Sequence, residues 1–127
     1  MDNVDLSKQS RGFTLIELMV VIGIVALLMA IAIPNFINFR NKAFCSEAET
    51  DANHIAMAVS DYYGSPLHTG LPTIEDLKIN IVNPAEITGD PNTTITILVT
   101  DRTGRCPSNY REASDYWENS IFHKYIQ

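Results

Sequence analysis

The apolar and polar positions of this chain form three regions of different pattern. A polar beginning gives way at Phe13 to an apolar run that continues to Ile33 and holds one charged side chain, Glu17. A helix of that length rises about 31 Å at 1.5 Å per residue, which is close to the hydrocarbon thickness of a bilayer. The run therefore predicts a membrane-spanning helix, and it is longer than the apolar core of an ordinary secretory signal.

Beyond the run, Pro34 predicts a kink or a break in a helix that otherwise continues to about Tyr63, because proline lacks the N–H of the helical ladder. At 100° per residue the apolar positions of this second part gather in a stripe about 120° wide. The stripe holds Cys45, Ala48, Ala52, Ile55, Ala56, Val59, Tyr62 and Tyr63. It predicts a face that packs against a globular head, while Phe36, Phe39 and Ala43 lie on another side.

The remaining residues, 64–127, predict a small head of mixed structure. Thr73 has the character of a helix N-cap and predicts a short helix to Lys78. The β-branched stretch 93–100 predicts a strand, and 79–83 is a second candidate strand. The stretch 110–127 fits either a helix or a late strand. These pieces predict an α+β fold in which a long kinked N-terminal helix packs against a small antiparallel sheet.

Charge and composition argue against several classes of function. A net charge of −6 over 127 residues disfavours a phosphate-binding surface, so nucleic acid is not expected as the main partner. The histidines His54, His68 and His123 have no metal-ligand spacing. No nucleophile–base pair, glycine-rich phosphate loop or paired-carboxylate motif is recognisable in the sequence. We expect no catalytic activity, no cofactor and no metal centre.

Two weaker motifs lie around the start of the strand predicted at 93–100. Asp90, Asn92 and Thr94 echo the beginning of a calcium-binding loop but lack its glycine and distal glutamate. Asn92 also begins a triplet that matches the N-glycosylation sequon, which is frequent by chance. Neither motif is specific enough to predict a site.

Glu17 needs an explanation, because an acid inside hydrocarbon costs a few kcal/mol and usually marks a partner or a function. The residue lies about one helical turn from the beginning of the apolar run, so solvation among lipid headgroups is one interpretation. A second interpretation comes from the residues around it.

The string GFTLIE, residues 12–17, follows a short charged leader and precedes an apolar helix that ends at Pro34. This arrangement resembles the N-terminal signature of type IV pilins and type II secretion pseudopilins, and the resemblance covers residues 11 to about 40. It implies that a membrane-embedded prepilin peptidase cuts between Gly12 and Phe13 and N-methylates the new Phe13 amine. In that family, the acid at the position of Glu17 helps recruit the subunit into a filament, where it is thought to meet the amino terminus of a neighbouring subunit.

The resemblance also implies how the chain is organised and where it resides. Residues 1–12 are a cleaved cytoplasmic leader, 13–35 the transmembrane and filament-core helix, 36–63 its amphipathic half and 64–127 the head. The subunit is expected in the bacterial inner membrane as a single-pass protein with its head outside the cytoplasm. It then polymerises with copies of itself, through inner-membrane assembly machinery, into a pilus at the cell surface.

Two alternatives stay open on the sequence alone. A type II secretion pseudopilin is built in the same way but forms a short periplasmic filament for export, and the N-terminal signature does not separate the two. A single-pass inner-membrane binding protein that never polymerises belongs to a different class and would keep its leader.

The two cysteines allow one disulfide. Cys45 lies on the stripe that faces the head and Cys106 follows the strand predicted at 93–100, so a bridge between them would join the sheet to the helix. In the chain-entropy model, closing a loop of about 61 residues contributes roughly 4 kcal/mol. Two buried free thiols are the alternative, which is less expected outside the cytoplasm. Familiar pilins keep their disulfide nearer the C-terminus, so this placement departs from their pattern.

Overall fold

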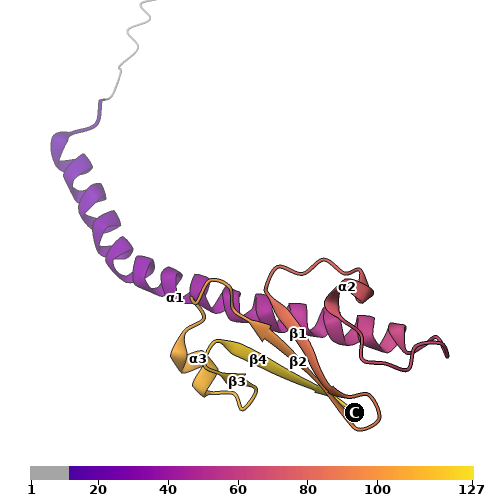
Figure 1. Ribbon diagram of the computed structural model, residues 1–127. Coiled ribbons are helices and arrows are strands. Elements are labelled where there is room, and N and C mark those ends of the chain that lie inside the picture. Colours follow the sequence, from indigo (N-terminus) through magenta and orange to yellow (C-terminus); the bar gives the residue numbers. More distant parts are fainter. Residues whose placement is uncertain (1–11) are drawn as a thin grey trace, which may run out of the picture. The chain divides into compact units, whose positions relative to one another are not determined.

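The computed structural model describes residues 12–127, and the predicted leader lies outside the described residues except for Gly12. Two compact units make up the chain, and they divide between Phe36 and Ile37. A single long helix, α1 (Leu15–Tyr62), contributes to both units, and all strands belong to the second (Figure 1).

The first unit consists mainly of the apolar part of α1. Every side chain described in residues 12–36 is exposed, and Phe13 reaches 91% and Leu27 72%. The helix is long and apolar enough to cross a membrane, and none of its most apolar stretch is buried within the protein. The α-helix continues through Pro34, so the break allowed by the sequence is absent; a kink there stays a prediction.

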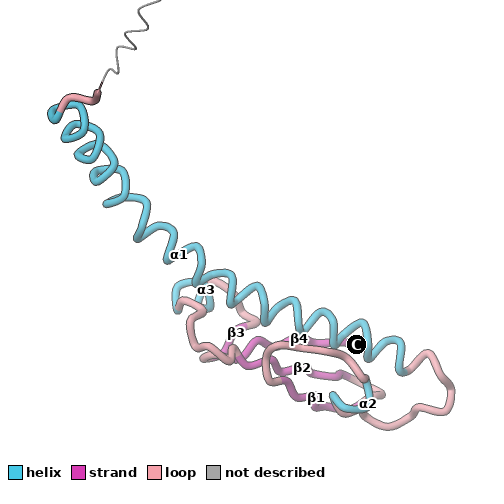
Figure 2. The backbone as a smooth tube through the Cα atoms, turned by 90° about the horizontal axis from the view of Figure 1, so that it is seen from above, coloured by secondary structure: helices cyan, strands magenta, loops and turns pink. Residues whose placement is uncertain are grey.

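The second unit contains a four-stranded antiparallel sheet. Its strands are β1 (Ala85–Asp90), β2 (Thr94–Thr100), β3 (Trp117–Glu118) and β4 (Ile121–Ile126), in the order β1-β2-β4-β3. Two short helices, α2 (Ile74–Leu77) and α3 (Ser108–Glu112), lie in the connections. Figure 2 shows the sheet lying along the second half of α1. The α+β fold predicted from the sequence is confirmed.

Two of the local predictions are confirmed, one alternative that the sequence left open is decided in favour of a strand, and one prediction is wrong. The strand predicted at 93–100 is β2, the stretch 110–127 ends in strand β4, and Thr73 is the N-cap of α2. The candidate strand at 79–83 is a loop, and the first strand begins at Ala85. The reason is that the N–H groups of Val82 and Asn83 donate to a carboxylate on α1 instead of to a strand.

Strand β1 contains one glycine, Gly89, which is paired with Ile95 of β2. Gly89 has a φ of 108°, in the region that only glycine adopts without strain. A Cβ at this position would collide with the carbonyl oxygen of Thr94. This position of β1 therefore requires glycine on both counts.

The core of the second unit lies between the predicted stripe of α1 and one face of the sheet. The buried apolar residues are Cys45, Ala48, Ala52, Ile55, Val59, Ile87, Ile95, Ile97, Val99, Cys106 and Trp117. Alternation along β2 sends every second side chain toward the helix, as its burial pattern shows. The helical periodicity seen in the sequence therefore identified the face of α1 that packs against the sheet.

Truncation of the core is the first test of this packing. Ile55 is fully buried, so Ile55→Ala is expected to lower the free energy of unfolding by about 2–5 kcal/mol through lost burial and the cavity left behind. Urea denaturation of the full chain in detergent measures this change. Met57→Ala, two residues along the same helix at a side chain 63% exposed, is the control and should change the value by less than about 0.5 kcal/mol. Equal effects of the two substitutions would contradict the packing described.

Candidate functional site

The first turn of α1 is closed by a reciprocal pair of side chains. The Thr14 N–H and the Thr14 hydroxyl both donate to Glu17 Oε2, at 3.1 and 3.0 Å, and the Glu17 N–H donates to Thr14 Oγ1 at 3.2 Å. This is a capping box, in which the N-cap hydroxyl and the acid three residues later satisfy each other's free N–H groups. The Glu17 carboxylate is thus held at the positive end of the helix dipole.

The peptide bond predicted to be cleaved lies immediately before this capped turn. Gly12 and Phe13 are both exposed, and a Cβ added to Gly12 would meet no other atom within 4 Å. The structure therefore leaves Gly12 and Phe13 uncovered by the described residues. It also places Phe13 directly before Thr14, whose N–H already contacts the Glu17 carboxylate.

Thr14 is the residue of this site whose role the sequence reasoning missed. Its signal was present, since a threonine followed three residues later by glutamate before an apolar run is the sequence pattern of a capping box. Glu17 therefore has hydrogen-bond partners within its own chain. These bonds need neither the lipid headgroups nor the neighbouring subunit that the sequence suggested as partners of Glu17.

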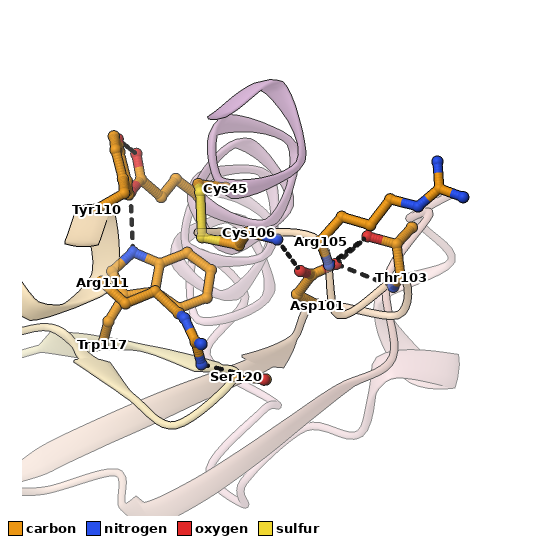
Figure 3. Close-up of a disulfide and its surroundings, with 10 residues drawn as sticks. Cys45, Asp101, Thr103, Arg105, Cys106, Tyr110, Arg111, Trp117 and Ser120 are labelled. Carbon is orange, nitrogen blue, oxygen red and sulfur yellow. Dashed lines mark hydrogen bonds between the residues drawn. A yellow bond between two sulfur atoms is a disulfide. The ribbon is translucent and has the colours of Figure 1, made fainter. Parts of the chain in front are cut away.

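The Cys45–Cys106 disulfide joins the head to α1. The two Cα atoms lie 5.0 Å apart across a sequence separation of 61 residues. Figure 3 shows the bond between the helix and the loop that follows β2. The bridge anticipated from the sequence is present, and neither cysteine is free.

Asp101 shapes the loop that carries Cys106. Its carboxylate accepts from the Cys106 N–H at 2.8 Å and from the Thr103 N–H and hydroxyl at 2.9 and 2.7 Å (Figure 3). Burial raises the pKa of Asp101, but the hydrogen bonds from Cys106 and Thr103 outweigh it, so the pKa lies below its ordinary value. The charged carboxylate thus holds the loop in the shape that presents Cys106 to Cys45.

Two acids on α1 hold other parts of the head. Glu49 accepts from the Trp117 indole N–H at 3.0 Å and from the Tyr110 hydroxyl at 3.2 Å. Burial, and then the negative charge and hydrogen bonding of Glu49, raise the pKa of Tyr110. Asp51 is buried and accepts from the Val82 N–H at 3.2 Å and from the Asn83 N–H and side-chain amide, both at 2.9 Å. These carboxylates are structural, because each is occupied by donors from the fold.

None of the weaker candidate residues assembles into a chemical site. Asp90 Oδ1 accepts from the N–H and the side chain of Asn92, at 2.8 and 3.2 Å, which serves the β1–β2 turn. His68 stacks on Tyr62 and contacts its carbonyl oxygen, while His54 is exposed. Within residues 12–127 no three histidine, cysteine or acidic side chains lie close enough to share a metal ion.

Comparisons with known proteins give one family profile and several related proteins. A family profile described as the prokaryotic N-terminal methylation motif matches residues 7–33. The type IV major pilin protein PilA of Myxococcus xanthus is 47% identical over 57 residues, which are 45% of this chain and 26% of that protein.

Two Neisseria proteins match a larger share of the chain. A fimbrial protein of Neisseria meningitidis is 37% identical over 89 residues, 65% of this chain and 52% of that protein. The type IV major pilin protein PilE of Neisseria gonorrhoeae is 37% identical over 84 residues, 66% of this chain and 48% of that protein. The chain thus spans about half, or less, of the length of the relatives that it matches. No solved structure matches it significantly.

The capping box is tested by removing the Thr14 hydroxyl while keeping the side-chain shape. Thr14→Val is expected to destabilise the first turn of α1 by about 1 kcal/mol, because the hydroxyl no longer bonds the Glu17 N–H. Amide hydrogen exchange of the full chain in micelles should then show roughly fivefold less protection over the first turn. Thr14→Ser keeps the hydroxyl and should retain most of the protection. Unchanged exchange in the valine variant would contradict the capping box.

The charge of Asp101 gives the head a defined pH dependence. Because the folded state holds this pKa below its ordinary value, the associated stability is present above about pH 4 and is lost as the pH falls through the folded pKa. Asp101→Asn should lower the free energy of unfolding by roughly 1–3 kcal/mol at pH 7 and should flatten its decline in acid. Denaturant unfolding of the full chain between pH 2 and 7 measures both. Asp115→Asn, at an exposed position, is the control, and an equal effect there would refute the assignment.

Proposed function

We propose that this chain, which belongs to the type IV pilin family, is the structural subunit of a type IV pilus. It is made as a membrane-anchored prepilin, is cleaved after Gly12, is N-methylated at Phe13 and polymerises through its N-terminal helix. The observation that carries the proposal is the methylation motif at residues 7–33, which includes Gly12, Phe13 and Glu17 and whose residues from Leu15 onward lie on an exposed apolar helix.

The exposed apolar surface of α1 suits a helix that moves from lipid to contacts with other helices during assembly. Every side chain from Leu15 to Phe39 is exposed. Such a surface needs lipid while the subunit is in the membrane, and it needs other apolar helices in a filament. Neighbouring copies of the same chain supply those helices, because all copies carry the same surface.

Glu17 has one carboxylate oxygen available for a neighbouring subunit. Both hydrogen bonds from Thr14 go to Oε2, and Oε1 has no hydrogen-bond partner among residues 12–127. Cleavage after Gly12 turns the Phe13 nitrogen into a cationic amine. Two unit charges 4 Å apart attract by about 4 kcal/mol at an effective dielectric of 20, before desolvation is subtracted. In the proposed filament, Glu17 Oε1 binds the Phe13 amine of a neighbour.

The proposed location and partners follow from the same steps. The precursor spans the bacterial inner membrane once, with its head outside the cytoplasm, where the Cys45–Cys106 disulfide is stable. Its partners are the prepilin peptidase, the assembly machinery of the inner membrane and further copies of itself. A type II secretion pseudopilin would share these steps. The names of the relatives, which are pilins and fimbrial proteins, favour the pilus.

Substitution of Glu17 tests the proposed assembly contact. Glu17→Ala should still give a cleaved, membrane-inserted subunit, because the substitution leaves Gly12, Phe13 and the apolar helix in place. Its filament yield should fall about tenfold or more, since losing only about 1.4 kcal/mol of attraction weakens association tenfold. The measurement compares mature subunit in membranes with subunit in sheared filaments. Asp61→Ala removes an exposed acid from the other end of α1 and should assemble normally.

A normal filament yield from the Glu17 variant would refute the proposed contact. Loss of the mature subunit from the membrane would also count against it, because that result would mean that Glu17 acts in insertion or processing instead of in assembly.

A further inference from the structure

Arg111, on α3, is a cation that the fold does not neutralise. Its Nη1 donates to the Ser120 hydroxyl oxygen at 3.2 Å, and its Nε is buried without a hydrogen-bond acceptor in the part of the chain that the structure describes. Among those residues, no carboxylate lies within 4.0 Å of the guanidinium. Arginine stays protonated in proteins and carries five N–H donors, so one neutral acceptor leaves most of its hydrogen-bonding capacity unused.

The guanidinium lines a small pocket on the head. The cavity has a volume of about 220 Å³ and is lined by Ser108, Arg111, Glu112, Trp117 and Asn119. Figure 3 shows Arg111 and Trp117 beside each other, with Ser120 at the end of the arginine side chain. This volume is below the roughly 300–1,000 Å³ typical of sites for drug-sized molecules, so the pocket suits a single small group.

Two further side chains in the pocket have hydrogen-bonding groups to offer. Neither the Ser108 hydroxyl nor the Asn119 amide forms a hydrogen bond with any other residue in the range 12–127. Together with Arg111 they provide three types of donor around one cavity. An oxyanion is the group that accepts hydrogen bonds from all three while also balancing the guanidinium charge.

We propose that this pocket binds a small oxyanion, the phosphate or carboxylate group of a ligand, with Arg111 as the cation and Ser108 and Asn119 as hydrogen-bond donors. The methylation motif at residues 7–33 includes none of the residues that line this pocket. The pocket lies entirely in the second unit, so the proposal does not depend on cleavage or polymerisation.

Glu112 sets the strength of this binding. It is exposed, it lines the same pocket, and it forms no ion pair with Arg111. Neighbouring positions of a helix project in different directions, which keeps the two charges from pairing directly. Its negative charge opposes the incoming anion, so the site distinguishes anions by charge and binds them weakly. Removing the charge of Glu112 strengthens binding, whereas removing that of Arg111 abolishes it.

The single tryptophan of the chain reports on the pocket. Trp117 is the only tryptophan and lies in the lining, so its fluorescence follows occupancy directly. The full chain in a neutral detergent is titrated with sodium phosphate in one series and with sodium acetate in another, at ionic strength held constant with sodium chloride. A saturable change is expected in at least one series. Which series saturates identifies the phosphate or the carboxylate group as the ligand.

Three variants separate the site from general charge effects. Arg111→Gln should remove the saturable change, and Glu112→Gln should tighten binding roughly fivefold, as expected for removing a like charge near the anion. Arg105→Gln removes an exposed cation that packs over Phe44, outside the pocket, and should bind like the parent chain. Because Glu112 is exposed, its substitution leaves the fold in place even if the Arg111 variant is destabilised.

The proposal is overturned if neither anion gives a saturable change, or if sodium chloride alone gives the same change. It is equally overturned if Glu112→Gln leaves the affinity unchanged, or if Arg105→Gln weakens binding as much as Arg111→Gln does.

Discussion

A carboxylate inside an apolar helix must find hydrogen-bond donors, and the N-terminal part of this molecule is arranged around that requirement. Thr14 provides two donors to one oxygen of Glu17 within the same chain. The other oxygen of Glu17 can still accept hydrogen bonds. The proposed cleavage after Gly12 would create a cationic amine at Phe13 in each copy. The capping box and the proposed filament contact therefore do not compete, because they use different oxygens of one side chain.

The hydrophobic core of the head is small. A helix of 48 residues offers one stripe to a sheet of four short strands, so burial alone orders little of the connecting loops. Asp51, Glu49 and Asp101 each accept two or more hydrogen bonds from distant or looping segments. The Cys45–Cys106 disulfide lies among them and fixes the loop after β2 to the helix. Charged acceptors and one covalent link thus supplement a limited core.

The predictable parts of this molecule are those that local patterns govern. The stripe from Cys45 to Val59 follows from a period of 3.6 residues, and β2 follows from its run of β-branched residues. The stretch 79–83 has the local pattern of a strand but forms a loop, because the N–H groups of Val82 and Asn83 bond to Asp51, 31 and 32 residues away, which no local pattern reveals. The capping box at Thr14 was local and could have been read from the sequence. The pocket at Arg111 could not be predicted from the sequence, because its lining residues come from both α3 and the turn before β4.

In the proposed filament, cleavage between Gly12 and Phe13 produces the amine that Glu17 binds. Intact-mass measurement of the mature protein, taken from membranes or from filaments, tests this most directly. We expect a chain that begins at Phe13, lacks residues 1–12 and carries one additional methyl group. A mature protein that still carries Met1 would contradict it, since no new amine would then exist for Glu17 to bind.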